Sequence, residues 1–414
     1  MNEAGLTRRL GLGDAVVIGA GSMIGAGVFA AWGPAAQAAG TGLLLGLAVA
    51  GLVAMCNAMS SAQLAAIHPE SGGTYLYGRR QLGPGWGHLA GWGFVVGKTA
   101  SCVAMALTAG SYLWPEYHRV VAAGFVIVVT LVNLGGLTRT VAVTRVLLVV
   151  SLAALTLVVV AGWSGGAASI DRLTPVETDL PGILRSGAFL FFAFAGYARI
   201  ATLGEEVKDP SVTIPRAIPT ALLAVLGIYA VVGTTALATA GVTALAGADA
   251  PLALVADPDS STVARLVGVG AAVASFGVLL NLVPGVSRTA LAMARNGELP
   301  RWFSVVDGSR SVPVRAELAV LVVVLAGVVT LDLTNSIAVS GLAVLTYYAV
   351  TNAAALTLAP TQRRWPPAVA VLGLVGCLAL VAALPAAALV GGGVVLVSGV
   401  GARWVTTRRA ALGR

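Results

Sequence analysis

The sequence carries little charge for its length. Only 10% of the 414 residues are Asp, Glu, Lys or Arg, and 57% are hydrophobic. A soluble domain typically has about 25% charged residues. The composition therefore excludes an ordinary soluble protein and predicts an integral membrane protein.

Cysteine and histidine are also scarce, with three of each. They are scattered, without disulfide, CxxC or HExxH spacing, at Cys56, Cys102, Cys377, His68, His88 and His118. No metal site and no cofactor is predicted. The sequence also lacks a G-x-x-x-x-G-K-[ST] phosphate loop, a catalytic constellation within the apolar stretches, and the filter loop or charge ring of a channel. These absences disfavour an ATP-driven pump, an intramembrane enzyme and a channel.

What the sequence does contain is a series of apolar stretches, most of them long enough to cross a ~30 Å hydrocarbon core as a helix. The twelve stretches lie near 13–37, 41–66, 84–110, 120–137, 141–163, 183–204, 217–240, 263–289, 315–331, 335–359, 367–385 and 387–405. The predicted fold class is therefore all-α, with one transmembrane domain over residues 1–414. The first stretch is too long for a cleavable signal peptide.

Basic residues are distributed unevenly between the predicted loops. With the N-terminus inside, nearly all of them fall on one side, and only Arg119, Arg172, Arg185 and Arg265 fall opposite. This asymmetry predicts a cytoplasmic membrane protein with both termini in the cytoplasm. The net charge of +8 then reflects topology and not a nucleic-acid partner.

The first apolar stretch contains "GAGSMIGAGVF", residues 19–29, with glycines at 19, 21, 25 and 27. Each glycine inside a helix costs roughly 1 kcal/mol relative to alanine. Two explanations are open: the glycines allow another helix to pack closely, or the helix is interrupted there. The sixth stretch has a similar oddity, "FFAFAGYAR", at 191–199. Paired interrupted segments predict an inverted repeat of five helices, 13–163 and 183–359, with two additional helices at 366–405.

An interrupted helix in a membrane exposes main-chain groups that must be satisfied by protein, water or ligand. Amides at the start of a half-helix suit a carboxylate, and carbonyls at the end of the preceding one suit an ammonium. A zwitterionic amino acid presents both groups on one carbon.

Four motifs resemble the amino acid–polyamine–organocation superfamily of secondary transporters. They are "GSMIGAGVF" in the first stretch, "HPESGGTYLYGRRQLGP" at 68–84, "FFAFAGYARIATLGEEVKDPSVTIPRAI" at 191–218 and "SRTALAMARNGELPRWF" at 287–303. The resemblance implies twelve helices in the five-plus-five (LeuT-like) inverted repeat, with discontinuous helices 1 and 6. It also implies a substrate site between those two helices, worked by alternating access.

The resemblance also implies which residues bind substrate. Carried onto this chain, the amides around Gly25, Ala26 and Gly27 and the Ser22 hydroxyl would take the carboxylate, with Gly21 beside them. The carbonyls of Met23, Phe192 and Ala195 would take the ammonium, with Ala193 and Gly196 in the same segment. Phe192 would also form an outer gate. We therefore expect this set to bind substrate: Gly21, Ser22, Met23, Gly25, Ala26, Gly27, Phe192, Ala193, Ala195 and Gly196.

Lys98 lies midway along the third stretch, where an ammonium costs ~3 kcal/mol to insert. One hypothesis is that it titrates and couples transport to protons, or meets an acidic group of the substrate. The alternative is that it reaches the interface or forms a static ion pair. The family pattern places a coupling lysine in the fifth helix, where this chain has Ser151. Arg199 is a candidate inner gate, or a static partner of Glu205 or Glu206.

These observations predict a secondary amino acid transporter. Neutral substrates are favoured because no acidic side chain is expected in the site, although acidic ones stay possible; a polyamine or cationic amino acid exchanger is the main alternative. Proton coupling or exchange is favoured over sodium, for which Ser275 is the one candidate hydroxyl. The lipid bilayer is the other expected partner, and the oligomeric state stays open.

Overall fold

The computed structural model describes residues 10–412 apart from 69, 71, 136–140, 175–177, 202–205, 256–260 and 307–311. The first half contains α1 (Leu12–Met23), α2 (Ala26–Ala30), α3 (Trp32–Ala39), α4 (Leu43–Ile67), α5 (Gly73–Gln81), α6 (Pro84–Leu113), α7 (His118–Leu134) and α8 (Val141–Ser164). The second half contains α9 (Leu180–Phe194), α10 (Ala198–Ala201), α11 (Pro210–Ala246), α12 (Pro251–Val255), α13 (Ser261–Arg295), α14 (Val314–Thr330), α15 (Leu333–Leu356), α16 (Pro367–Ala382) and α17 (Ala386–Leu412). Within the described ranges the only β pairing is one isolated bridge, so the all-α prediction is confirmed there.

Each of the twelve predicted apolar stretches is largely helical. By length and hydropathy, nine helical segments of the described chain can cross a membrane, or ten if α16 and α17, which meet at 115°, form one broken span. Helices α14 and α16 have 17 and 16 residues, which is shorter than the roughly 20 that cross a bilayer unaided. A multi-pass membrane fold is thus supported, while the count of twelve spans and the inverted repeat stay predictions.

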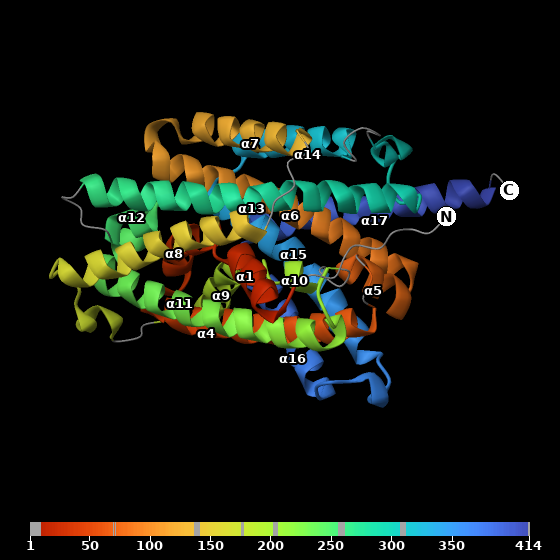
Figure 1. Ribbon diagram of the computed structural model, residues 1–414, viewed down its shortest axis with the longest axis horizontal. Coiled ribbons are helices and arrows are strands. Elements are labelled where there is room, and N and C mark those ends of the chain that lie inside the picture. Colours follow the sequence, from red (N-terminus) through yellow and green to blue (C-terminus); the bar gives the residue numbers. More distant parts are fainter. Residues whose placement is uncertain are drawn as a thin grey trace.

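Most of the long helices run along the long axis of the molecule, and the short broken helices lie inside (Figure 1). In that view α1, α9 and α10 lie between α6 and α13 on one side and α4 and α11 on the other. Helix α1 contacts α8, α10, α11 and α13, and α9 contacts α3, α4 and α15. The two predicted irregular helices are therefore the inner layer of the bundle.

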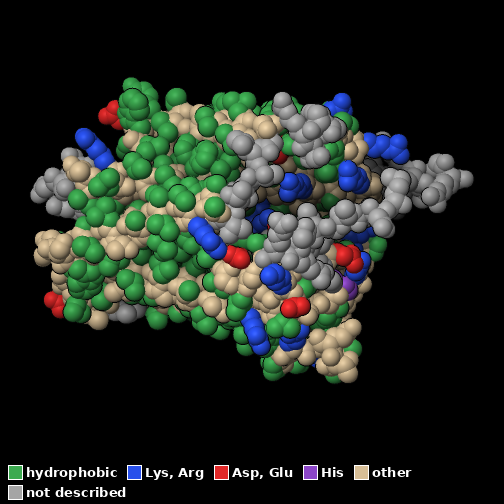
Figure 2. Space-filling model, viewed as in Figure 1, with side chains coloured by type: hydrophobic (Ala, Val, Ile, Leu, Met, Phe, Trp, Pro, Cys, Tyr) green, Lys and Arg blue, Asp and Glu red, His purple; other side chains and the backbone are tan. Residues whose placement is uncertain are grey.

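Two of the four arginines predicted on the outer side contact helix ends predicted on the same side. Arg119 donates to the carbonyls of Val328 (2.7 Å) and Val329 at the end of α14, and Arg185 donates to Ala383 after α16 (3.0 Å). Carbonyls at helix C-termini favour such cations. On the face in Figure 2, most Lys and Arg side chains gather toward the opposite end, on the right. Which end faces the cytoplasm stays a prediction from the charge asymmetry.

The loop at 68–84 contains a short helix, α5, which packs against α6 and α15. Glu298, in the loop after α13, accepts hydrogen bonds from Tyr75 of α5 (3.0 Å), from Arg79 and from Arg403 of α17 (2.6 Å). His88 at the start of α6 lies 3.6 Å from the same carboxylate. Burial raises the pKa of Glu298, but the hydrogen bonds from His88, Tyr75 and Arg403 and the charge of Arg79 outweigh it, so the pKa lies below its usual value. This carboxylate therefore links α5, α6, α17 and the loop after α13 at one end of the bundle.

Candidate functional site

The first predicted interruption lies between α1 and α2. Helix α1 makes its last hydrogen bond from Ile24 N to Ala20 O (2.7 Å), and Gly25 N then turns back to Met23 O (2.8 Å). The backbone of Gly25 is extended, which any residue can adopt, so conformation does not require glycine here. Space does, because a Cβ on Gly25 would lie 2.3 Å from a methyl group of Val278 on α13. The predicted break in helix 1 is confirmed.

The second interruption separates α9 from α10. Residues 195–197 form a turn with i+3 bonds, from Ala195 N to Phe192 O (3.4 Å) and from Tyr197 N to Phe194 O (3.3 Å). Such bonds are longer and weaker than those of a regular helix. The predicted break in the sixth stretch is also confirmed, and it leaves the carbonyls of Ala193 and Ala195 without regular helical partners.

The two breaks touch each other through glycines. A Cβ on Gly27 would lie 2.7 Å from the Cα of Ala193, and one on Gly196 would lie 2.0 Å from the carbonyl oxygen of Ser22. Both distances are far below van der Waals contact, so only glycine fits. The two explanations of the glycine cluster are therefore both correct: the helix is interrupted, and its glycines allow close packing.

A small cavity of about 20 Å³ lies where the breaks meet. Its walls come from both broken helices and from α6 and α13, and are formed by Ser22, Met23, Gly27, Lys98, Ser101, Met105, Phe192, Ala193, Ala195, Gly196, Val278 and Leu282. A cavity needs about 10–15 Å³ to hold one water molecule, so this one admits a water but is too small for an amino acid. An amino acid can bind here only if the helices move apart.

Most of the predicted binding residues line this cavity, but some do not. Gly25 and Ala26 lie beside it, and Gly21 packs instead toward Thr144 of α8, with a Cβ position 3.1 Å from that side chain. Ser22 lines the cavity and donates to Ile18 O of its own helix (2.8 Å). The roles assigned to these residues stay predictions.

Lys98 points into the site. Its side chain is buried, with 6% exposed, and Nζ donates to the carbonyl oxygen of Ala195 at 3.0 Å. Cys102, one turn along α6, is within electrostatic reach, and the described residues place no carboxylate within ion-pair distance. Among the described residues, Lys98 therefore neither extends to the membrane interface nor forms a static ion pair with a carboxylate. The lysine instead serves a main-chain oxygen at the break in the sixth stretch.

Two tyrosines that the sequence did not single out complete the site. Tyr229 of α11, 1% exposed, donates to Met23 O at 2.7 Å and to Ala193 O at 3.0 Å, and so bridges the two breaks. Tyr348 of α15 donates to Ala195 O at 3.4 Å. A buried tyrosine usually needs a partner for its hydroxyl, and this is the one signal that could have pointed to them.

Of the other predicted coupling and gating residues, Phe192 lines the cavity, and Ser151 and Arg199 do not. Ser151 of α8 donates to Leu147 O (2.8 Å), and Ser275 of α13 donates to Ala271 O (2.7 Å), each within its own helix. Arg199 is exposed on α10, within electrostatic reach of Glu206 and Arg288. The alternative partner Glu205 lies outside the described residues.

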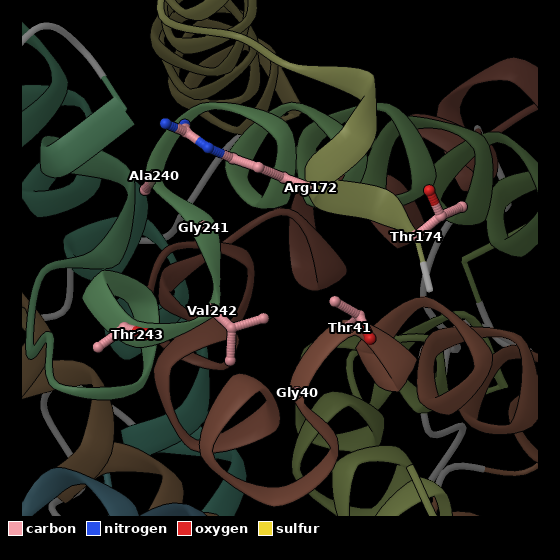
Figure 3. A pocket seen from close by; sticks show the side chains of 8 residues that line it. All are labelled: Gly40, Thr41, Arg172, Thr174, Ala240, Gly241, Val242 and Thr243. Atoms are coloured by element: carbon pink, nitrogen blue, oxygen red, sulfur yellow. The ribbon is translucent and has the colours of Figure 1, made fainter. Parts of the chain in front are cut away.

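A larger cavity of about 450 Å³ lies elsewhere, at the end of the bundle predicted to be outside (Figure 3). Figure 3 shows Arg172 extending along its edge toward Ala240. The guanidinium donates to Ala238 O (3.1 Å) and Thr239 O, just before a kink at Gly241 where φ is 74°. This arginine therefore serves the end of a helical segment, and the hollow is a surface depression. Neither cavity carries a metal cluster: in the part of the chain that the structure describes, no group of three His, Cys, Asp or Glu side chains could hold an ion.

Known proteins are similar to this chain over most of its length. A family profile described as amino acid permease matches residues 10–402. An uncharacterized transporter of Mycobacterium tuberculosis is 54% identical over 410 residues, 98% of this chain and 93% of that protein. The branched-chain amino acid permease BcaP of Bacillus subtilis is 27% identical, covering 75% of this chain and 72% of its own. The vacuolar cationic amino acid transporter 4 of Arabidopsis thaliana is 28% identical, covering 76% and 57%.

Proposed function

Because the chain belongs to the amino acid permease family, we propose that it is a secondary transporter that carries amino acids across the cytoplasmic membrane by alternating access. The observation that carries this proposal is the meeting of two broken membrane helices at one cavity. Main-chain groups freed by such breaks suit a zwitterion, and transporters with broken helices bind substrate at this kind of junction.

In the proposed binding mode, the amides around Gly25, Ala26 and Gly27 hold the substrate carboxylate, with help from the Ser22 hydroxyl. The carbonyls of Met23, Phe192 and Ala195 hold its ammonium. The break between α1 and α2 leaves the amides of the residues after Gly25 at the start of a helix. This helix continues from α2 into α3 and ends at Ala39, because Ala31 N donates to Gly27 O and Ala35 N donates to Ala31 O. A helix start of this kind favours an anion.

The cavity walls favour a neutral side chain. Met105, Val278 and Leu282 form an apolar wall, the lining contains no carboxylate, and Lys98 would repel a cationic side chain. The relative from Bacillus subtilis carries the name of a branched-chain amino acid permease, which fits this choice. The second candidate is an exchanger of cationic amino acids; the name of the Arabidopsis thaliana relative, a cationic amino acid transporter, fits the cationic substrate. For coupling we favour protons, with Lys98 as the titrating group.

Counterflow tests the transport proposal. The purified protein is placed in liposomes that contain unlabelled amino acids, and labelled amino acid is added outside. Alternating access predicts that an internal substrate accelerates uptake of the labelled amino acid. The preference for neutral substrates predicts that internal leucine or valine does so, whereas internal lysine and arginine do not. A flux that ignores the internal amino acid would contradict alternating access.

The coupling proposal needs a matched pair of variants. Lys98→Gln should abolish the pH dependence of uptake, because it removes the titrating ammonium. Lys208→Gln, which changes the chain's other, exposed lysine, should keep it. An unchanged pH profile in Lys98→Gln would refute the role of Lys98 in coupling.

A further inference from the structure

The carbonyl oxygens at the two breaks already have donors from other helices. Lys98 donates to Ala195 O at 3.0 Å, and Tyr229 donates to both Met23 O at 2.7 Å and Ala193 O at 3.0 Å. These donors come from α6 and from the segment of α11 before its kink at Gly241, on either side of the broken pair. The arrangement is a closed one, since the cavity between the breaks measures only about 20 Å³.

Such donors matter because a buried carbonyl without a partner is costly. A transporter whose carbonyls are satisfied by substrate alone closes readily with substrate bound and poorly without it. Here Lys98 offers Ala195 O the same chemical group as an amino acid does, a primary amine on a saturated carbon. It is therefore equipped to take the place of the substrate ammonium at that oxygen.

Tyr229 satisfies its carbonyl partners less completely than Lys98 does. Its hydroxyl has one hydrogen and two carbonyl partners, so the hydrogen serves Met23 O or Ala193 O at any moment. Met23 O has a second donor in Gly25 N, at 2.8 Å. Ala195 O depends on side chains, and Tyr348 is the longer of its two contacts at 3.4 Å. Lys98 is thus the donor on which the break in the sixth stretch mainly depends.

We propose that the Lys98 amine is a built-in stand-in for the substrate ammonium at Ala195 O, which lets the binding site close and reorient without substrate. The consequence is the mode of transport: the protein performs net transport and is not an obligatory exchanger. This inference rests on the proposed function, because it assumes that an amino acid binds between the broken helices.

The test compares net uptake with exchange in liposomes that contain the full chain. The probe is a uniformly ¹⁴C-labelled mixture of the proteinogenic amino acids, so the result does not depend on knowing the substrate. Net uptake is measured into liposomes without internal amino acid, and exchange into liposomes preloaded with the unlabelled mixture. The wild type should show both activities.

Lys98→Gln should lower net uptake at least tenfold more than it lowers exchange, because a hydrogen bond from a charged donor shifts an equilibrium by about 10- to 100-fold. Lys98→Arg, which keeps a cationic donor, should restore much of the lost net uptake. Lys208→Gln should leave the ratio of the two activities at the wild-type value. If Lys98→Gln is not monodisperse after purification, Tyr229→Phe replaces it, and net uptake should again fall more than exchange.

The outcomes separate the two proposals. Exchange without net uptake in the wild type overturns this inference and leaves the proposed function standing. An equal loss of both activities in Lys98→Gln also overturns it. If the wild type shows neither activity with any amino acid, the proposed function itself fails.

Discussion

Replacing Gly196 by alanine tests the packing of the two breaks with a single methyl group. The new Cβ would lie 2.0 Å from Ser22 O, 2.3 Å from Ser22 C and 2.7 Å from Met23 N. All three are backbone atoms, which cannot rotate out of the way. To reach ordinary contact at 3.4 Å, the break in the sixth stretch must move away from α1 by about 1.4 Å.

The size of the effect follows from the cost of overpacking, about 1–3 kcal/mol for an extra methyl group in a filled site. This cost falls on the closed conformation, in which the breaks touch. Its population relative to open conformations should drop by about 5- to 150-fold, because each 1.4 kcal/mol is a factor of ten. Net transport, in which the empty site must return through the closed conformation, should slow by a similar factor.

The matched control is Gly227→Ala on α11. A Cβ at that position meets nothing within 4 Å, and alanine is the better helix former by roughly 1 kcal/mol. We expect Gly227→Ala to melt at or slightly above the wild-type temperature in detergent and to take up amino acids into empty liposomes at the wild-type rate. Gly196→Ala should melt at a lower temperature and show slower net uptake. A Gly196→Ala protein with wild-type melting temperature and wild-type net uptake would refute the contact between the breaks.

Three further predictions concern the rest of the bundle. Because its pKa is lowered in the folded protein, Glu298 contributes stability that is present above the unfolded pKa of about 4.3 and lost as pH falls through the lower folded value. The melting temperature should therefore fall below pH 4.5, and Glu298→Gln should flatten that fall; an identical pH profile contradicts the ion cluster. The double variant Asn57→Ala/Asn352→Ala should be destabilised by about 0.6–1.7 kcal/mol less than the sum of the two single variants, because the buried 2.6 Å hydrogen bond between the two side chains is lost only once. Strict additivity in chemical denaturation would count against this hydrogen bond. Arg119→Gln should destabilise by about 1–2 kcal/mol, because the charge facing the carbonyls at the end of α14 is lost, and wild-type thermal stability would exclude that role.

The interrupted helices could be predicted from the sequence because their signal is local. Glycines at 19, 21, 25 and 27 inside an apolar stretch have no purpose in a simple helix, and the second break follows from the paired oddity at 191–199. Lys98 stood out for the same reason, as a lone charge in an apolar stretch. Each of these features conflicts with its immediate surroundings, and such a conflict is visible without a fold.

The donors to the carbonyls could not be predicted in this way. A tyrosine in an apolar helix is ordinary, and the acceptors of Tyr229 and Tyr348 are main-chain oxygens, which every residue carries. Their pairing depends on how α11 and α15 cross the breaks, which is a property of the tertiary structure. Ser151 was chosen by its place in a family pattern; its hydroxyl bonds to its own helix outside the cavity, and its role stays a prediction.

The glycines and the donors together explain how a broken helix can be stable in the middle of a membrane protein. Close approach at Gly27 and Gly196 excludes all but a small volume between the breaks, so water cannot satisfy every freed carbonyl. Side chains from neighbouring helices must then supply the hydrogen bonds, as Lys98 and Tyr229 do. An amino acid that enters must displace Lys98 from Ala195 O and separate the glycine contacts, so its binding free energy is reduced by the cost of both steps. It follows that weakening either the contact or the donor should raise the apparent affinity for substrate while it lowers the rate of closure, a split between KM and kcat that neither a channel nor a rigid binding pocket would produce.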